Sequence, residues 1–440
     1  MYKKLTYASP LLFSLMASPS SAAGLSLAEQ VSAYAEALEE KAIAWRHDIH
    51  KHPELGNQEF RTAGLVAEHL RKLGMEVETE VGTTGVVAVL RGGEPGPVVA
   101  LRADMDALPV KEATGLPYAS TVRQMYHGEE RYVMHACGHD AHVAILLATA
   151  EVLAGVRDRL PGTVKFIFQP AEEGPSDYVY DGERFFGARQ LVEEGVLKAP
   201  EVDVIFGLHV TSAAPTGVVA YRSGPVMASS SDLHITVSGR QSHAAQPWDG
   251  VDPIVTSAQI INALQTVVSR QTNIMPPRAV VSIGTIHGGT RHNIIPDSVE
   301  MTGTIRTFDD EVQKQVNEDI RRTSEHIALA AGAEADVAII ENYATTVNDP
   351  ALTAQMLPTL KRVAPHVVES PLVTGSEDFS YYAQEVPGLF FFLGVTPMEN
   401  PGHAAPNHSP EFLVDDAALV TGIKTLAALT VDYMLQAQQD

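Results

Sequence analysis

Residues 134–140 read MHACGHD, and an apolar run, AILLA, follows at 144–148. The run predicts a buried helix, so Cys137 and His139 are expected in a loop that enters the N-terminus of that helix. The glycine between them lets the backbone bend, and Cys137 is the single cysteine of the chain. Thiolate and imidazole are ligands of zinc and related metals. On these residues alone, a metal site and a buried free cysteine beside a hydrogen-bonded histidine both remain open.

Length and composition narrow the class of protein. A chain of 440 residues with 45% hydrophobic content is expected to form two globular domains rather than one core. The net charge of −23 argues against nucleic acid and anionic membrane surfaces as partners. A single cysteine excludes a disulfide within the chain. Small molecules are therefore the expected partners.

The N-terminus has the pattern of a secretory signal peptide. Lys3 and Lys4 precede an apolar stretch at 11–17, and small residues follow at 18–23. The apolar stretch is too short to span a bilayer, which disfavours a membrane anchor. We therefore expect residues 1–23 to be removed and the mature protein to be periplasmic or secreted, without a membrane partner.

Helices and short apolar strands alternate along the rest of the chain. This pattern predicts an α/β fold with a mostly parallel sheet. Between 221 and 341 the predicted order is strand, helix, two strands, helix and strand, which is typical of a ferredoxin-like sandwich. We therefore predict a discontinuous catalytic domain at 24–220 and 342–440, with a second domain inserted at 221–341.

Side chains that bind metals or move protons follow the predicted strands of the first domain. Asp104 and Asp106 follow one strand, Glu172 and Glu173 follow another, and His209 follows a third. In open α/β sheets, ligands bind beyond the carboxyl ends of the strands. These side chains are therefore expected to meet at one edge of the sheet.

Five candidate metal ligands of mixed type result from this survey: Cys137, His139, Glu173, His209 and His408. One tetrahedral site needs fewer, so the set predicts two metal ions about 3.5–4 Å apart, an arrangement used for hydrolysis. One ligand must then bridge, and Cys137 is the candidate. Glu172 is assigned as the general base that takes a proton from metal-activated water. The alternative for the glutamate pair is an acidic turn that faces solvent.

Three further histidines, His47, His50 and His52, are interpreted as a solvated helix face.

Several motifs occur in a fixed order. They read RADMDALP at 102–109, MHACGHD at 134–140, QPAEEG at 169–174, GLH at 207–209, SHAA at 242–245, GVDP at 250–253, NIIPD at 293–297 and GSEDF at 375–379. Together they closely resemble the metal-dependent amidohydrolases typified by hippurate hydrolase, indole-3-acetyl-amino-acid hydrolases and N-acetyl-diaminopimelate deacetylase, which are relatives of aminoacylase and carboxypeptidase G. The resemblance covers essentially the whole mature chain.

The resemblance implies a dinuclear site for two divalent ions (Zn, Mn, Co or Ni), with the inserted domain as lid and homodimerisation surface. It matches the five ligands above to the family's ligand positions and Glu172 to its general base. It matches His243 to a lid histidine that polarises the scissile carbonyl, from the same or the partner subunit. Asn293 and the loop with Gly375 and Ser376 correspond to substrate-binding or closure elements, and Asp106 to a residue that supports the ligands.

Two stretches, 121–132 and 175–185, look longer than the family's usual links. Their aromatic residues and the one that follows are hypothesised to shape the acyl pocket: Tyr126, Tyr178, Tyr180, Phe185 and Phe186. The expected reaction is hydrolysis of the amide of an N-acyl (aromatic or acetyl) amino acid to a carboxylate and a free amino acid. The alternatives are a dipeptidase or carboxypeptidase on the same scaffold and a non-catalytic periplasmic binding protein. The intact base argues against the binding protein.

Overall fold

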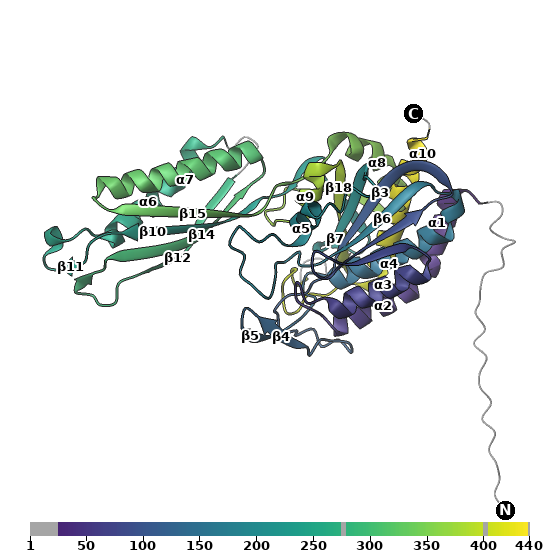
Figure 1. Cartoon of the computed structure of the whole chain (residues 1–440), viewed down its shortest axis with the longest axis horizontal. Helices are drawn as coiled ribbons and strands as arrows, with labels where there is room; N and C mark the ends of the chain where they lie inside the picture. Colours follow the sequence, from purple (N-terminus) through teal and green to yellow (C-terminus); the bar gives the residue numbers. More distant parts are fainter. Residues whose placement is uncertain (1–24, 274–278, 399–403, 439–440) are drawn as a thin grey trace, which may run out of the picture.

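The computed structural model describes residues 25–273, 279–398 and 404–438, so the predicted signal peptide at 1–23 lies outside the described residues. Most of the chain forms a layered α/β body around an eight-stranded sheet, in the order β1-β2-β6-β3-β7-β18-β8-β17 (Figure 1). The strands are β1 (Glu76–Val81), β2 (Gly85–Arg91), β3 (Glu94–Asp104), β6 (Pro161–Gln169), β7 (Val204–Pro215), β8 (Val218–Tyr221), β17 (His366–Glu369) and β18 (Gly388–Thr396).

The predicted α/β fold class is confirmed, with a mixed sheet. Strands β6, β3, β7 and β18 are parallel neighbours in the centre, and β8 pairs with β17 in parallel. The β1–β2, β2–β6 and β18–β8 pairs are antiparallel. The parallel centre brings the carboxyl ends of β3, β6 and β7 to one edge, which is the edge where the candidate site residues were expected.

Helices cover both faces of the large sheet. They are α1 (Leu27–Ala37), α2 (Glu39–Lys51), α3 (Phe60–Lys72), α4 (His139–Gly155), α5 (Gly187–Glu193), α8 (Pro350–Val363), α9 (Phe379–Glu385) and α10 (Leu419–Gln436). Helix α4 is buried along almost its whole length, as the apolar run at 144–148 predicts. The helical stretch Asp416–Gln436, which includes α10, is long and apolar enough to cross a membrane. However, 72% of its apolar 18-residue stretch is buried inside the protein, so it is a core helix here.

The inserted segment from Ser230 to Tyr343, called the small domain below, has its own antiparallel sheet, in the order β12-β14-β10-β15. Its elements are β10 (Ser230–Ser238), α6 (Pro253–Thr266), β12 (Ala279–Gly288), β14 (Ser298–Thr307), α7 (Asp310–Ala330) and β15 (Glu334–Tyr343), which is a βαββαβ order. The remainder of the described chain is called the large domain. Asp252 caps α6 by accepting hydrogen bonds from Ile254 N and Val255 N, which explains part of the GVDP motif.

Two short strand pairs define the ends of the small domain. Strand β9 (Gly224–Met227) pairs with β16 (Thr346–Asn348), so the two chain crossings between the domains lie side by side. At the end of the small domain far from the large sheet, β11 (Ser242–His243) pairs with β13 (Ile294–Ile295) (Figure 1). A third pair, β4 (Arg123–Tyr126) with β5 (Glu129–Tyr132), is a hairpin within the predicted insert at 121–132.

A buried charge cluster joins α2 to the start of α4. His50 is 2% exposed; its Nδ1 lies 2.9 Å from Asp140 Oδ2 and its Nε2 lies 3.2 Å from Glu112 Oε1. Arg46 Nε donates to the same Asp140 oxygen at 3.2 Å. The interpretation of the α2 histidines as a solvated face is therefore wrong for His50, because carboxylates distant in sequence enclose it.

His50 makes stability depend on pH. Although burial opposes its charge, Asp140 and the hydrogen bonds to Asp140 and Glu112 raise the pKa of His50 to about 9. Its protonation therefore stabilises the folded state fully below about pH 6.5, and this contribution is lost as the pH rises through about 9. We expect chelator-treated protein to lose on the order of 2 kcal/mol of unfolding free energy across this range through His50. Urea unfolding at several pH values should show a shallower loss for His50→Gln, and parallel curves would contradict the prediction.

Candidate metal centre

Cys137 and His139 stand at the entry to α4, as predicted. Gly138 between them has φ 98°, a left-handed conformation that favours glycine. A Cβ at this position would lie 2.3 Å from Val210 Cγ2, so a side chain would also collide with β7. The glycine thereby allows the cysteine loop to approach the strand that carries His209.

Asp106 fixes the orientation of His139. His139 Nδ1 lies 2.8 Å from Asp106 O and 3.1 Å from Asp106 Oδ1, so this nitrogen donates its proton there. His139 Nε2 is then left as a lone-pair donor, and it is buried without a hydrogen-bond partner. The other carboxylate oxygen of Asp106 accepts from Glu173 N at 2.8 Å. Asp106 thus holds two candidate ligands from behind, the usual task of a residue that supports metal ligands.

The other two candidate histidines meet at the cysteine. His209 Nδ1 donates to Val210 O at 2.7 Å, which leaves His209 Nε2 free, 3.3 Å from Cys137 Sγ. His408 Nε2 also lies 3.3 Å from Cys137 Sγ. Asn407 holds this arrangement together, because its Nδ2 donates to Cys137 O at 3.0 Å and to Val210 O at 3.1 Å.

The two glutamates differ in their surroundings. Glu173 Oε1 lies 2.9 Å from His408 Nε2; burial opposes ionisation, but the hydrogen bond from His408 lowers the pKa of Glu173 overall. Burial, with Glu377 and Glu173 close by, raises the pKa of Glu172 well above its usual range. Glu172 Oε2 lies 3.9 Å from His139 Nε2. Glu172 is therefore suited to carry a proton beside the ligand cluster, and it does not face solvent as an acidic turn would.

The donor atoms fit a metal site. Among the described residues, Cys137, His139 and His209 form one set and Cys137, Glu173 and His408 another, with ligand atoms within 4.8 Å of one another in each set. Cys137 belongs to both sets, as a bridging ligand would. The unpartnered His139 Nε2 and the buried carboxylates around the thiol call for positive charge at this place. Burial and the neighbouring Glu173 and Glu172 raise the pKa of Cys137 well above its usual range, so a cation is needed to hold it as thiolate.

A cleft of about 570 Å³ opens beside this cluster and reaches both domains. Gly375 and Ser376, predicted to bind substrate, line it. Among the described residues, His243 and Asn293 do not line this cleft; they lie at the β11–β13 pair, at the far end of the small domain (Figure 1). One copy of the chain therefore brings together the five candidate ligands, Glu172 and Asp106, but not these two residues.

Sequence reasoning missed Arg306. Arg306 lies on β14 and lines the cleft, and its Nη1 donates a hydrogen bond to Ser376 Oγ at 3.1 Å. It is the one lysine or arginine among the described residues that line the cleft. The only sequence signal was its place near the end of a predicted strand, which does not distinguish it from other strand arginines.

The aromatic residues of the two inserts lie elsewhere than hypothesised. None of the five lines the cleft as described. Tyr180, Phe185 and Phe186 instead line a small hollow next to Tyr343 and Tyr381, where the two domains meet. Burial, and after it the negative charge of Glu173, raises the pKa of Tyr126. A role in shaping the acyl pocket has no support from this arrangement.

Comparison with known proteins agrees with the site. The model of peptidase family M20/M25/M40 matches residues 100–432. Thermostable carboxypeptidase 1 of Saccharolobus solfataricus is 43% identical over 411 residues, 93% of this chain and 99% of that protein. N-acetylcysteine deacetylase of Bacillus subtilis is 38% identical over 397 residues, 90% of this chain and 97% of that protein.

Among solved structures, the YXEP protein of Bacillus subtilis, described as a dinuclear metal binding peptidase from family M20, matches with a TM-score of 0.75 and 36% identity. The match covers 91% of this chain and 99% of that chain. The family match spans most of the chain, and the candidate ligands lie within it. The chain therefore belongs to peptidase family M20/M25/M40 and is a metal-dependent hydrolase of amide or peptide bonds.

Proposed function

We propose that the protein hydrolyses the amide of N-acyl amino acids and releases a carboxylate and a free amino acid. The observation that carries the proposal is the position of Arg306, a permanent cation in the same cleft as the metal-ligand cluster. A guanidinium matches the carboxylate of an amino acid in charge and geometry. A substrate with its carboxylate at Arg306 can extend its amide towards Glu172 and the ligand cluster.

Each residue of the site then has its own role in the proposed reaction. Two divalent ions, held by Cys137, His139, Glu173, His209 and His408, would supply Lewis acidity and lower the pKa of water. Glu172 accepts the proton of the attacking water and passes it to the leaving nitrogen. Ser376 holds the Arg306 guanidinium in place. Zn, Mn, Co and Ni are the ions that this mixed S, N and O donor set suits.

A carboxypeptidase or dipeptidase is the second candidate, and Asp232 is the observation that favours it. Asp232 lines the cleft on the side of the small domain, and an aspartate there could receive a free α-amine. The similarity to a protein named as a carboxypeptidase agrees with this alternative. Hydrolysis of hippurate, acetyl-Phe and acetyl-Cys compared with Gly-Phe separates the two, because only the dipeptide carries the free amine.

We further propose that two copies pair through the small domain and that His243 acts in the partner's site. In one copy His243 is exposed and far from the cleft, and Asn293 Oδ1 is buried without a hydrogen-bond partner. Exposed apolar side chains lie near His243 in sequence, with Trp248 74% and Val255 54% exposed. Apolar exposure of this kind is a common mark of a protein interface. Export through residues 1–23 stays a prediction from the sequence.

Chelation followed by metal addition tests the metal centre. Hippurate hydrolysis should stop when the ions are removed and return with one of Zn, Mn, Co or Ni. Glu172→Gln should lower kcat by about 10²–10⁴-fold, because it removes the general base. Its metal content, measured by atomic emission, should stay at the wild-type level. Activity that resists chelation, or a Glu172→Gln variant as fast as the wild type, would contradict the proposed function.

Arg306→Met tests carboxylate recognition. Removing a charged hydrogen-bond partner should lower kcat/KM for hippurate by about 10–100-fold. The neutral analogue hippuramide is the matched control, because it has no carboxylate for Arg306 to bind. Wild type and variant should hydrolyse hippuramide at similar rates. An equal loss of kcat/KM on both substrates would show that Arg306 does not bind the substrate carboxylate.

Mixing two inactive variants tests which subunit supplies His243 to an active site. His243→Ala and Glu172→Gln are mixed under conditions that exchange subunits. If His243 acts in the partner's site, each mixed dimer has one complete site, so about a quarter of wild-type activity should return after random exchange. If His243 serves its own subunit, each subunit of the mixed dimer is defective and the mixture stays inactive.

A further inference from the structure

Three hydrogen bonds hold the loop that carries Glu172. Ala171 N donates to Glu59 Oε1 at 2.8 Å, Glu173 N donates to Asp106 Oδ2 at 2.8 Å, and Tyr343 Oη donates to Glu172 O at 2.7 Å. The loop is tightly bent, with a positive φ of 51° at Ala171. Each of these consecutive residues is thus fixed by one distant side chain.

The three bonds come from different parts of the molecule. Glu59 and Asp106 belong to the large domain, as does the loop itself. Tyr343 is the last residue of β15 and pairs with Ser230 of β10, inside the sheet of the small domain. A displacement of that sheet therefore acts directly on the backbone of Glu172 through Tyr343.

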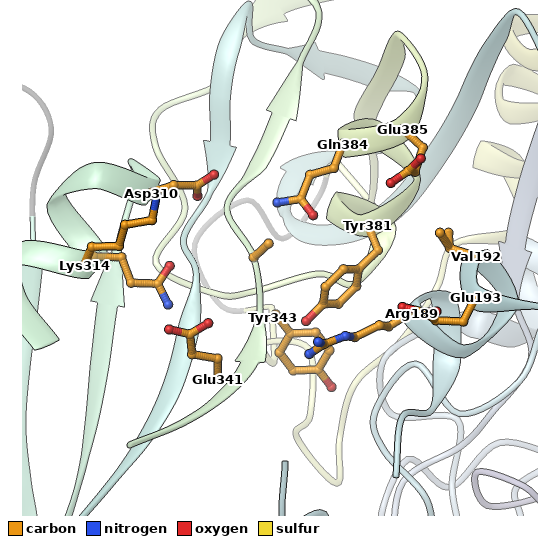
Figure 2. A pocket seen from close by; sticks show the side chains of 12 residues that line it. Arg189, Val192, Glu193, Asp310, Lys314, Glu341, Tyr343, Tyr381, Gln384 and Glu385 are labelled. Carbon is orange, nitrogen blue, oxygen red and sulfur yellow. The ribbon is translucent and has the colours of Figure 1, made fainter. Parts of the chain in front are cut away.

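The surroundings of Tyr343 leave room for such a displacement. Tyr343 lines both the metal cleft and a separate cavity of about 400 Å³ between the domains. Figure 2 shows this cavity, with Glu341 and Lys314 of the small domain facing Arg189 and Tyr381 of the large domain, and Tyr343 between them. The contact between the domains is therefore not a continuous packed core at this place.

We propose that Tyr343 is a positioning residue that couples the placement of the small domain to the orientation of the Glu172 carboxyl. The inference rests on the proposed function, in which Glu172 accepts the proton. The carbonyl that Tyr343 holds and the carboxylate that does the chemistry belong to one residue, so fixing the carbonyl restricts the side chain. A substrate whose carboxylate binds Arg306 of the small domain then helps to set the base at the other end of the cleft.

Tyr343→Phe is a sharp test, because it removes one oxygen atom and keeps the ring. Tyr381→Phe is the matched control: Tyr381 Oη donates to Asn342 O at 3.0 Å, a bond to the neighbouring residue of Tyr343 that does not involve Glu172. Tyr343→Phe should lower kcat for hippurate by about 3–10-fold with KM within about two-fold, the loss expected for one hydrogen bond. Tyr381→Phe should leave both constants within about two-fold.

Hippuramide tests the coupling to the small domain. It cannot engage Arg306 through a carboxylate, so the loss of kcat in Tyr343→Phe should be smaller with hippuramide than with hippurate. Equal losses on the two substrates would overturn the coupling. Unchanged kcat in Tyr343→Phe, an equal loss in Tyr381→Phe, or a raised KM at unchanged kcat would overturn the positioning role.

Two controls separate the inference from the proposed function. Metal content and thermal midpoint are measured for each variant, and loss of metal from Tyr343→Phe would overturn a role that acts on Glu172. Glu172→Gln is assayed alongside. If it remains active, the proposed function fails; if it is inactive while Tyr343→Phe keeps full kcat, only the positioning role fails.

Discussion

The buried guanidinium of Arg102 is the constraint on which the site depends. It lies 2.7 Å from Asp104, 2.9 Å from Glu377 and 2.7 Å from Asp378, and its side chain is wholly buried. Asp104 in turn contacts His142 Nδ1 at 2.6 Å, and His142 Nε2 accepts from Val210 N, beside His209. Removing one member of such a network leaves an uncompensated buried charge, which is strongly destabilising. The anionic edge of the sheet can thus persist because the Arg102 guanidinium balances part of its charge, and metal ions held by the ligand cluster would balance more.

Much of the site could be predicted because it is local to strand ends. Glu173 follows β6 and His209 lies within β7, and a parallel sheet brings residues at these positions together without knowledge of side-chain packing. The position of the cysteine loop could be predicted equally well, since a glycine and a buried helix follow Cys137. His408 was also among the predicted ligands, and the resemblance matched it to a ligand position, although its loop comes from far along the chain.

The rest depends on contacts that no local pattern encodes. The burial of His50 depends on Asp140 and Glu112, and the importance of Arg306 and Tyr343 depends on how the small domain meets the large one. The antiparallel edges of the large sheet also went unpredicted, because strands such as β1 and β8 are short and partly exposed. The inserts were recognised by length, but Tyr180, Phe185 and Phe186 pack where the domains meet.

The paired crossings β9 and β16 have a consequence for the order of folding. The chain leaves the large domain before its sheet is complete, because β18, which lies between β7 and β8, and α10 come after the insertion. A chain that emerges N-terminus first therefore has every strand of the small domain before it has β18, which joins β7 to β8 in the large sheet, and domains generally fold as units. The last segment also brings His408 to Cys137. A chain shortened before this segment can contain a finished small domain, yet it cannot assemble the metal centre.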